Sequence, residues 1–309
     1  MKLVKRMTAM FLAVLLVFAV TACGSKNDSA GAGPVTIIDR EGREIELPAK
    51  TDKIISMAAS ITETLIDLGL GDRIIAADIY SEGINGLKSG LPLFDMMNPD
   101  AETMAAMGPD LIFASGMSRE SGGDPFKPVT DLGVVMTYIP SSDSIAEIKN
   151  DIRFIGRMTG TDARAEAIIG DMEKEIEEIN MRARASSQYK TVYFEISAAP
   201  YLYSSGGGTF LNEMIELVCA ENILAGQDSW LSVSEETVID KNPDVIFTNV
   251  NYIDDPIGEI KSRPGWGVIT AAAENQVFYI DTDSSSRPNE FIVKAMREMA
   301  RALHPGLFD

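Results

Sequence analysis

The stretch ETMAAMGPDLIF at residues 102–113 returns in altered form as ETVIDKNPDVIF at residues 236–247, with every matched position 134 residues from its counterpart. In each copy a short amphipathic segment leads through Pro-Asp into an apolar run, which is typical of a helix, a tight turn and a buried strand. The repeat therefore predicts two similar α/β lobes. A cleft between two such lobes is where a small ligand is usually held.

Strand-like and helix-like segments alternate through most of the chain. Apolar runs at 54–57, 74–77, 111–114 and 134–139 predict the strands of the first lobe, and runs at 191–196, 245–248 and 277–280 predict those of the second. Helix-like segments separate them, at 61–68, 100–107, 128–132, 210–218, 235–241 and 290–303. Such alternation is typical of mostly parallel sheets covered by helices. The expected fold class is therefore α/β, with a hairpin at 35–47 opening the first lobe.

One long helical segment lies between the two copies of the repeat. Apolar residues recur at spacings of three and four from Ser144 to Ala185, with a break at Thr159-Gly160-Thr161. A helix over the second half is about 36 Å long at about 1.5 Å per residue. We expect a stiff interdomain helix at 161–186, joining an N-terminal lobe at 35–160 to a C-terminal lobe at 187–309.

The first residues predict export from the cytoplasm. Lys2, Lys5 and Arg6 precede an apolar run at 7–20, which is shorter than the ~20 residues that a membrane-spanning helix needs. The following Val-Thr-Ala-Cys resembles a bacterial lipobox, although an ordinary signal with an incidental cysteine is the alternative. We expect a signal peptide at 1–22, lipid on Cys23 and a flexible tether at 23–34. The protein is then extracytoplasmic and anchored to the cell membrane.

The composition excludes several classes of function. The formal net charge of −19 argues against nucleic acid as a partner, because phosphate binding depends on Lys and Arg. The single histidine, His304, and the second cysteine, Cys219, cannot supply a nitrogen- or sulfur-rich metal site or a catalytic thiol with its base. We interpret Cys219 as a small core residue and His304 as a helix-end or surface residue. No metal site, cofactor or catalytic residue is expected.

Two polar loops are expected in the second lobe. The run SSGGGT at 204–209 precedes a helix but lacks the lysine of a phosphate-binding loop. We interpret it as a loop at the cleft edge, beside Tyr201 and Tyr203; an extracytoplasmic enzyme that uses this loop is a distant alternative. Arg287 lies in the other loop, where a guanidinium is either solvated or placed to meet a carboxylate or other anionic group.

Together these segments resemble the substrate-binding proteins of bacterial ABC importers that carry ferric siderophores, heme or cobalamin. The resemblance extends over nearly the whole mature chain. It includes both copies of the repeat, IISMAASITETLIDLGLGDRIIA at 54–76, GGGTFLNEMIELVCAENIL at 206–224 and RPGWGVITAAAENQVFYID at 263–281. It implies two α/β lobes bridged by one long helix, limited hinge closure, a ligand held between the lobes, and no enzymatic activity.

The resemblance also implies roles for individual residues. One glutamate on each lobe is expected to dock on arginines of the permease dimer, and the matching positions are Glu102 and Glu236. Ligand-binding residues are expected at Met57, Ala58, Ser60, Tyr80, Gly116, Met117, Tyr201, Tyr203, Trp230, Asn251, Tyr252 and Arg287. We expect a monomer that delivers its ligand to the permease. A ferric siderophore is the favoured ligand, cobalamin or heme the alternative, and Tyr80 or Met117 could ligate heme iron.

Overall fold

The computed structural model describes residues 36–47, 49–119, 122–186 and 189–308. The predicted signal peptide, Cys23 and the tether lie outside the described residues. Within these ranges, no helix is both long enough and apolar enough to cross a membrane.

The N-terminal lobe contains a five-stranded sheet whose strands are all parallel. Its order is β5 (Leu93–Phe94), β4 (Ile74–Asp78), β3 (Ile54–Met57), β6 (Leu111–Ser115) and β7 (Met136–Ile139). The helices of this lobe are α1 (Ala59–Asp67), α2 (Ala101–Ala106) and α3 (Lys127–Asp131), and a hairpin of β1 (Thr36–Ile38) and β2 (Glu44–Glu46) precedes them. Burial on both faces explains the continuous apolar runs of the central strands.

The C-terminal lobe contains a second parallel sheet, in the order β10 (Ala220–Asn222), β8 (Lys190–Glu195), β12 (Val245–Thr248) and β13 (Val277–Tyr279). Its helices are α6 (Phe210–Leu217), α7 (Glu235–Lys241), α8 (Pro256–Ser262), α9 (Thr270–Ala273), α10 (Thr282–Ser286) and α11 (Ile292–Leu303). The mostly parallel sheets predicted from the sequence are confirmed. The sequence missed α8, α10 and the antiparallel pair of β9 (Tyr203–Ser205) and β11 (Trp230–Ser232).

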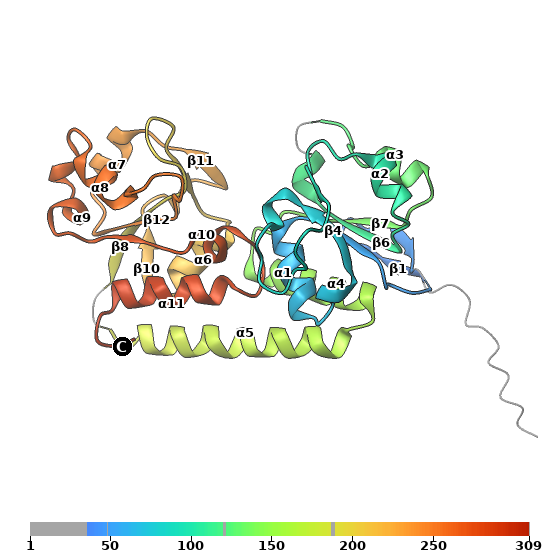
Figure 1. The fold of residues 1–309 in the computed structure, drawn as a ribbon. Helices are drawn as coiled ribbons and strands as arrows, with labels where there is room; N and C mark the ends of the chain where they lie inside the picture. The colour runs from blue at the N-terminus through green and yellow to red at the C-terminus, as the bar shows by residue number, and fades with distance from the viewer. Residues whose placement is uncertain (1–35, 48, 120–121, 187–188, 309) are drawn as a thin grey trace, which may run out of the picture. The chain divides into compact units, whose positions relative to one another are not determined.

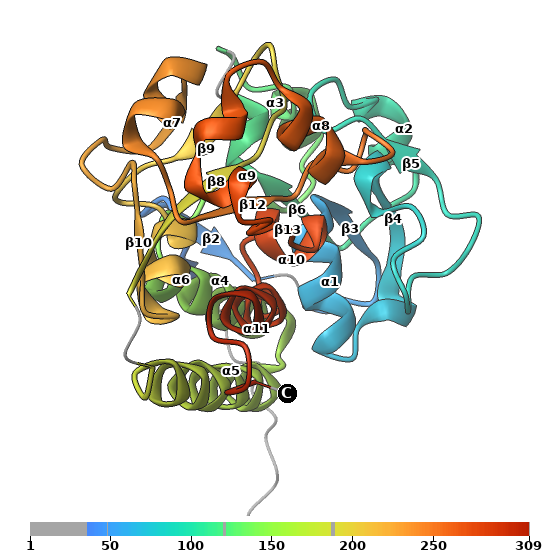
Figure 2. The ribbon, with the colours of Figure 1, turned by 90° about the vertical axis from the view of Figure 1, so that its left-hand side faces the viewer.

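The long helical segment is two helices, α4 (Ile145–Thr159) and α5 (Asp162–Ala183). Gly160 ends α4 in the left-handed conformation, with φ of 71°, which is the turn expected at the break in the pattern. A Cβ on Gly156 would lie 2.6 Å from that of Ala165, so glycine permits the two helices to approach closely. From the second lobe, α11 returns to lie along α5 (Figures 1 and 2). The helix is as predicted; the domain boundaries around it stay a prediction.

The two copies of the repeat form the same local structure. Asp100 and Ser234 accept hydrogen bonds from the backbone N–H groups of Thr103 and Thr237, at 3.0 and 3.2 Å, and so cap α2 and α7. The aspartates of the two Pro-Asp turns are also equivalent. Asp110 accepts from the Lys53 backbone at 3.0 Å, and Asp244 accepts from the Thr191 backbone at 2.8 Å. Each aspartate therefore fixes the start of the neighbouring strand.

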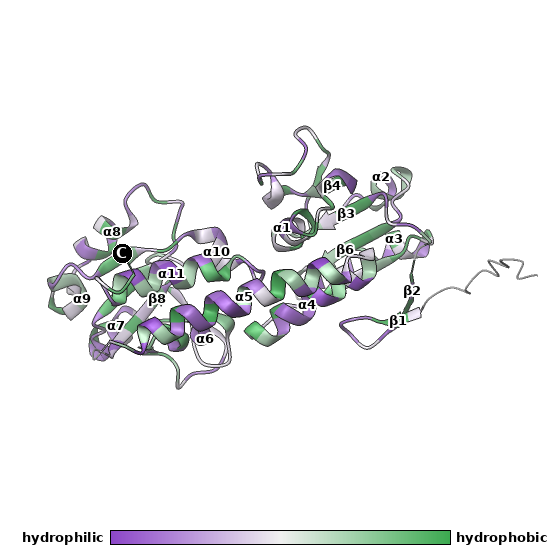
Figure 3. Ribbon diagram, turned by 90° about the horizontal axis from the view of Figure 1, so that it is seen from below, coloured by the Kyte–Doolittle hydropathy of each residue, from purple (hydrophilic) through white to green (hydrophobic). Residues whose placement is uncertain are grey.

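The largest of three hydrophobic clusters runs beneath both lobes. One cluster joins Phe113 of β6 and Phe247 of β12 to apolar residues of α4, α5 and α11. The opposite face of each sheet has a cluster of its own, around Ile112 in the first lobe and Ile246 in the second. Figure 3 shows hydrophobic and hydrophilic bands alternating along α5, as expected of a helix with one buried side. Because the lobes share core side chains with these helices, we expect only limited motion between them.

Candidate ligand-binding site

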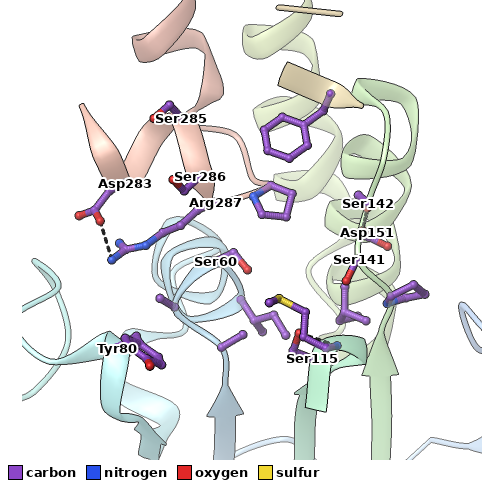
Figure 4. A pocket seen from close by; sticks show the side chains of 18 of the residues that line it. Ser60, Tyr80, Ser115, Ser141, Ser142, Asp151, Asp283, Ser285, Ser286 and Arg287 are labelled. Carbon is purple, nitrogen blue, oxygen red and sulfur yellow. Dashed lines mark hydrogen bonds and ion pairs between the residues drawn. The ribbon is translucent and has the colours of Figure 1, made fainter. Parts of the chain in front are cut away.

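A pocket of about 950 Å³ is lined by residues of both lobes. Its lining residues follow the carboxyl ends of the parallel strands. Ser60 comes after β3, Tyr80 after β4 and Ser115 at the end of β6, while Asn249 follows β12 and Asp283 follows β13. Figure 4 shows side chains from the two lobes facing the same space. Ligands of open parallel sheets bind beyond these strand ends, and the volume is within the range of small-molecule sites.

Hydroxyl and amide groups make up most of the polar wall. They come from helices, strand ends and loops of both lobes, and Figure 4 labels several of them. The members are Ser60, Thr64, Tyr80, Ser115, Ser141, Ser142, Tyr203, Ser229, Asn249, Asn251, Thr282, Ser285 and Ser286. Such groups are neutral and both donate and accept hydrogen bonds. The wall is therefore suited to a ligand with many neutral polar groups.

The apolar part of the wall is aromatic on the C-terminal lobe. Phe210 and Trp230 lie with ring centroids 5.5 Å apart, and Trp230 is half-buried at the pocket. Met96, Met117 and the exposed ring of Tyr80 supply apolar surface on the opposite lobe. Large flat side chains with a polar edge are effective surfaces for binding a macrocycle.

The charged residues of the pocket are mainly acidic. Among the described residues that line it, Arg287 is the one cationic side chain, against the four aspartates Asp78, Asp143, Asp151 and Asp283. Arg287 Nη2 lies 2.8 Å from Asp283 Oδ1, as Figure 4 marks, and Nη1 lies 2.5 Å from Oε1 of Glu63 on the other lobe. Burial raises the pKa of Glu63, and the Arg287 guanidinium opposes that rise. The arginine is thus already neutralised by two carboxylates.

Two of these aspartates are held by neighbouring groups. Asp78 accepts hydrogen bonds from Ser81 Oγ at 2.5 Å and from the Tyr80 backbone at 3.0 Å, and burial raises its pKa. Asp151 forms an ion pair with Arg40 and accepts from Ser142, and its pKa is also raised by burial. These bonds fix the loops that carry the pocket wall.

The chain matches the model of the periplasmic binding protein family over residues 54–284. It belongs to that family. It is 27% identical to an uncharacterized ABC transporter substrate-binding lipoprotein, YvrC of Bacillus subtilis, over 98% of this chain and 99% of that protein. A cobalamin-binding protein of Halobacterium salinarum is 24% identical, over 90% of this chain and 76% of that protein. A solved structure of a possible iron-binding protein from Staphylococcus epidermidis has a TM-score of 0.74 at 29% identity, covering 82% and 99% of the two chains.

This periplasmic binding protein is therefore a substrate-binding protein of the ABC importer type and not an enzyme. The comparisons leave its ligand open. Within the described residues there is no group of three or more His, Cys, Asp or Glu side chains arranged to hold a metal ion.

Eight of the twelve predicted ligand-binding residues line the pocket. They are Ala58, Ser60, Tyr80, Met117, Tyr203, Trp230, Asn251 and Arg287. The other four do not. Met57 is buried in β3, and Tyr201 is 83% exposed. Gly116 packs closely against the chain, since a Cβ there would lie 3.1 Å from Pro140 Cα. Tyr252 accepts a hydrogen bond from the Ala198 backbone at 2.9 Å. The sequence prediction missed Thr64, Asp78, Phe210 and Ser285. The end of β4 at Asp78 and the start of α6 at Phe210 were usable signals, whereas Thr64 lies within α1 and Ser285 within the short α10.

The glycine-rich loop has a packing role rather than the predicted place at the pocket. Gly206 and Gly207 are buried and are not part of the pocket wall. A Cβ on Gly206 would lie 2.0 Å from the Gln227 carbonyl oxygen, so only glycine permits this approach of the two chain segments. Its neighbour Tyr203, at the start of β9, does line the pocket.

The interpretations of His304 and Cys219 were only partly right. His304 does end α11, but it is buried, and its Nε2 lies 2.7 Å from the Val218 carbonyl oxygen. Cys219 is half-buried with a positive φ of 58°, at the turn after α6, rather than in the core.

The two predicted docking residues are equivalent in the structure. Glu102 and Glu236 are exposed and occupy the first turns of α2 and α7. Hydrogen bonding from the helix start and from Ser234 lowers the pKa of Glu236. Both helices lie away from α5 within their lobes (Figure 1). Their permease-docking role stays a proposal.

A buried carboxyl joins the two lobes beside the pocket. Thr64 of α1 donates a hydrogen bond to Glu290 Oε2 at 2.8 Å, whereas Glu290 Oε1 has no partner among the described residues. Burial raises the pKa of Glu290 to about 7. The native state therefore binds this proton more tightly than the unfolded state does. The contribution of this proton to the free energy of unfolding is fully present below the pKa of Glu290 in the unfolded chain, and it is lost as the pH rises through about 7.

We expect Glu290→Gln to raise the melting temperature at about pH 8 and to change it little at about pH 5, because glutamine resembles the protonated acid. Differential scanning calorimetry at both pH values measures this. Glu178→Gln, at an exposed position of α5, is the control and should have little effect at either pH. A gain that is equal at the two pH values would contradict the assignment.

Proposed function

We propose that this protein captures a cobalamin-type corrinoid in the pocket and delivers it to the permease of an ABC importer. The observation that carries the proposal is the combination of a wall rich in hydroxyl, amide and aromatic groups with an arginine already paired with Glu63 and Asp283. A corrinoid has a flat macrocycle edged by neutral amides, which such a wall can contact and hydrogen-bond. The similarity to the cobalamin-binding protein of Halobacterium salinarum also supports a corrinoid ligand.

A ferric hydroxamate siderophore is the second candidate, and the four aspartates favour it. Trihydroxamate chelates of Fe³⁺ are neutral or cationic, so an acidic pocket does not repel them. This second candidate is the kind of iron complex that the sequence analysis favoured, now limited to chelates that are neutral or cationic. Catecholate and citrate chelates are anionic, and heme carries two propionates. For these ligands the described wall offers no unpaired cation.

Isothermal titration calorimetry of the delipidated protein distinguishes the candidates. Cyanocobalamin, a ferric trihydroxamate, a ferric tricatecholate and hemin are titrated separately. The proposal expects saturable 1:1 binding of cyanocobalamin that is at least tenfold tighter than that of the anionic chelates, a difference of about 1.4 kcal/mol. Tightest binding of the tricatecholate or of hemin would overturn it.

Trp230 should report the binding directly. Because Trp230 lines the pocket and Trp266 is fully buried with its Nε1 donating to Glu235 at 2.9 Å, ligand binding should quench Trp230 more strongly than Trp266. We expect Trp230→Ala to weaken cyanocobalamin binding by ~1–3 kcal/mol, as loss of an aromatic wall does. In Trp230→Phe the remaining fluorescence should respond less than that of the wild-type protein. An unchanged affinity in both variants would place the ligand elsewhere.

We also propose the predicted route to the membrane. Lipid on Cys23 holds the mature chain as a monomer at the outer face of the cell membrane, and the tether gives it reach to the permease. The lipobox-like sequence and the lipoprotein relative YvrC support this. Metabolic labelling with a fatty-acid analogue tests it, since Cys23→Ala should lose the label and be released into the medium or periplasm.

A further inference from the structure

Arg287 lies at the pocket wall, but its guanidinium is enclosed by protein carboxylates. Glu63, on α1 of the other lobe, lies at 2.5 Å, and Asp283, one turn before Arg287, lies at 2.8 Å. Asn289 donates to the second oxygen of Glu63 at 2.6 Å, so both oxygens of this carboxylate are held. Glu63 is therefore fixed toward the arginine by hydrogen bonds to both of its carboxylate oxygens from residues 287–289.

The three charged groups together carry one net negative charge at the edge of the pocket. The Glu63 side chain is only 14% exposed, whereas that of Asp283 is 58% exposed. Solvent screens a buried carboxylate less than an exposed one, so Glu63 has the larger effect on the potential that a ligand meets. An anionic ligand that reached Arg287 would therefore meet a guanidinium whose charge is already compensated by two carboxylates.

We propose that Glu63 and Asp283 set the charge selectivity of the pocket by occupying Arg287 and thereby excluding anionic chelates, with Glu63 making the larger contribution. The inference rests on the proposed function insofar as this pocket is the ligand site. It identifies Glu63 as a selectivity residue although Glu63 is not itself part of the pocket wall.

A purely structural role for Glu63 makes a different prediction. Loss of a structural contact would weaken the binding of every ligand together, through the position of α1. Loss of a neutralising charge changes the ratio of affinities for anionic and neutral ligands. The Thr64–Glu290 hydrogen bond also joins α1 to the other lobe, and Glu63→Gln leaves this bond in place. The position of α1 should therefore change little in this variant.

The test compares Glu63→Gln, Asp283→Asn and the double variant with the wild-type protein. Two probes are titrated by calorimetry: cyanocobalamin, which is neutral, and a ferric hexadentate tricatecholate, which is a trianion. Glu175→Gln is the matched control, because it removes a carboxylate paired with an arginine, Arg297 at 2.9 Å, outside the pocket. Asp283 is largely exposed, so Asp283→Asn should fold even if Glu63→Gln does not.

We expect Glu63→Gln to tighten binding of the trianion about tenfold and Asp283→Asn to tighten it about threefold, as a charged hydrogen bond to Arg287 becomes available. The double variant should exceed both, and added salt should reduce the gains. Any change in cyanocobalamin affinity should be smaller than the gain for the trianion in each variant, because cyanocobalamin carries no net charge. Gains for the trianion no larger than those of Glu175→Gln, or equal gains for both probes, would overturn the proposal.

The outcome also separates this inference from the proposed function. If the wild-type protein binds no cyanocobalamin but Glu63→Gln still gains affinity for the trianion, charge selectivity stands and the corrinoid proposal fails. If the wild-type protein binds cyanocobalamin and Glu63→Gln gains no affinity for the trianion, the corrinoid proposal stands and the charge-selectivity proposal fails.

Discussion

Reversing the two glutamates that we propose dock on the permease, in Glu102→Lys/Glu236→Lys, is expected to abolish uptake of the ligand by whole cells while the purified protein keeps its affinity within about threefold, under ~1 kcal/mol. Both side chains are exposed, at equivalent positions of α2 and α7, and neither lines the pocket. Like charges placed against the arginines of a permease cost several kcal/mol of docking energy. Uptake of labelled ligand and calorimetry on the same variant measure the two effects separately.

The control is Glu177→Lys/Glu178→Lys, which changes the net charge equally at exposed positions of α5. It should leave uptake near the wild-type level. Each single reversal at Glu102 or Glu236 should give an intermediate loss, because the repeat offers one contact per lobe. Normal uptake by the double reversal, or loss of ligand affinity in it, would show that these residues do not dock on the permease.

The largest effect on stability is expected at Arg263. Its guanidinium donates to both oxygens of Glu195, at 2.6 and 2.8 Å, and their side chains are 4% and 0% exposed. It also lies 4.4 Å from the ring centroid of Trp266. Arg263→Met should lower the free energy of unfolding by ~3–5 kcal/mol, because Glu195 is left as an unpaired buried charge. Urea denaturation followed by circular dichroism measures this.

Two comparisons show whether the buried charge is the cause. Arg153→Met, which breaks a surface pair with Glu166, should cost less than ~1 kcal/mol. The Glu195→Leu/Arg263→Met double variant should recover much of the loss, since replacing both members of a buried pair is often neutral. The penalty of the single variant should also shrink as the pH falls, because burial raises the pKa of Glu195 and protonation removes the unpaired charge. A loss that is independent of pH and not recovered would point to packing alone.

Local patterns in the sequence were sufficient for most of the fold. The repeat at 102–113 and 236–247 predicted a capped helix, a turn and a buried strand in each lobe, and both copies have that structure. The same is true of α4 and α5, because apolar spacing and the break at Gly160 are properties of adjacent residues. Short elements such as β9, β11 and α10 were missed, since they carry little periodicity and depend on what packs against them.

The sequence also predicted part of the candidate site and missed the rest. Residues directly after strand ends, such as Ser60, Tyr80 and Met117, were predicted to face the ligand and do line the pocket. Arg287 was expected to be solvated or to meet an anionic group. It is paired with a carboxylate of the chain itself, Glu63, which lies 224 positions earlier and which no local pattern connects with it. Likewise, the glycines at 206 and 207 had a motif-like spacing, but contacts with residues 225–227 determine their role.

The sequence by itself therefore determined the two lobes and the helices between them, because these follow from periodicity and motifs within a few tens of residues. The class of transport protein came from the resemblance of nearly the whole mature chain to importer substrate-binding proteins. Only the tertiary structure decided the charge of the pocket. That charge depends on which carboxylates approach Arg287, and the approach is set by the packing of α1 from one lobe against the segment that leads into α11 of the other.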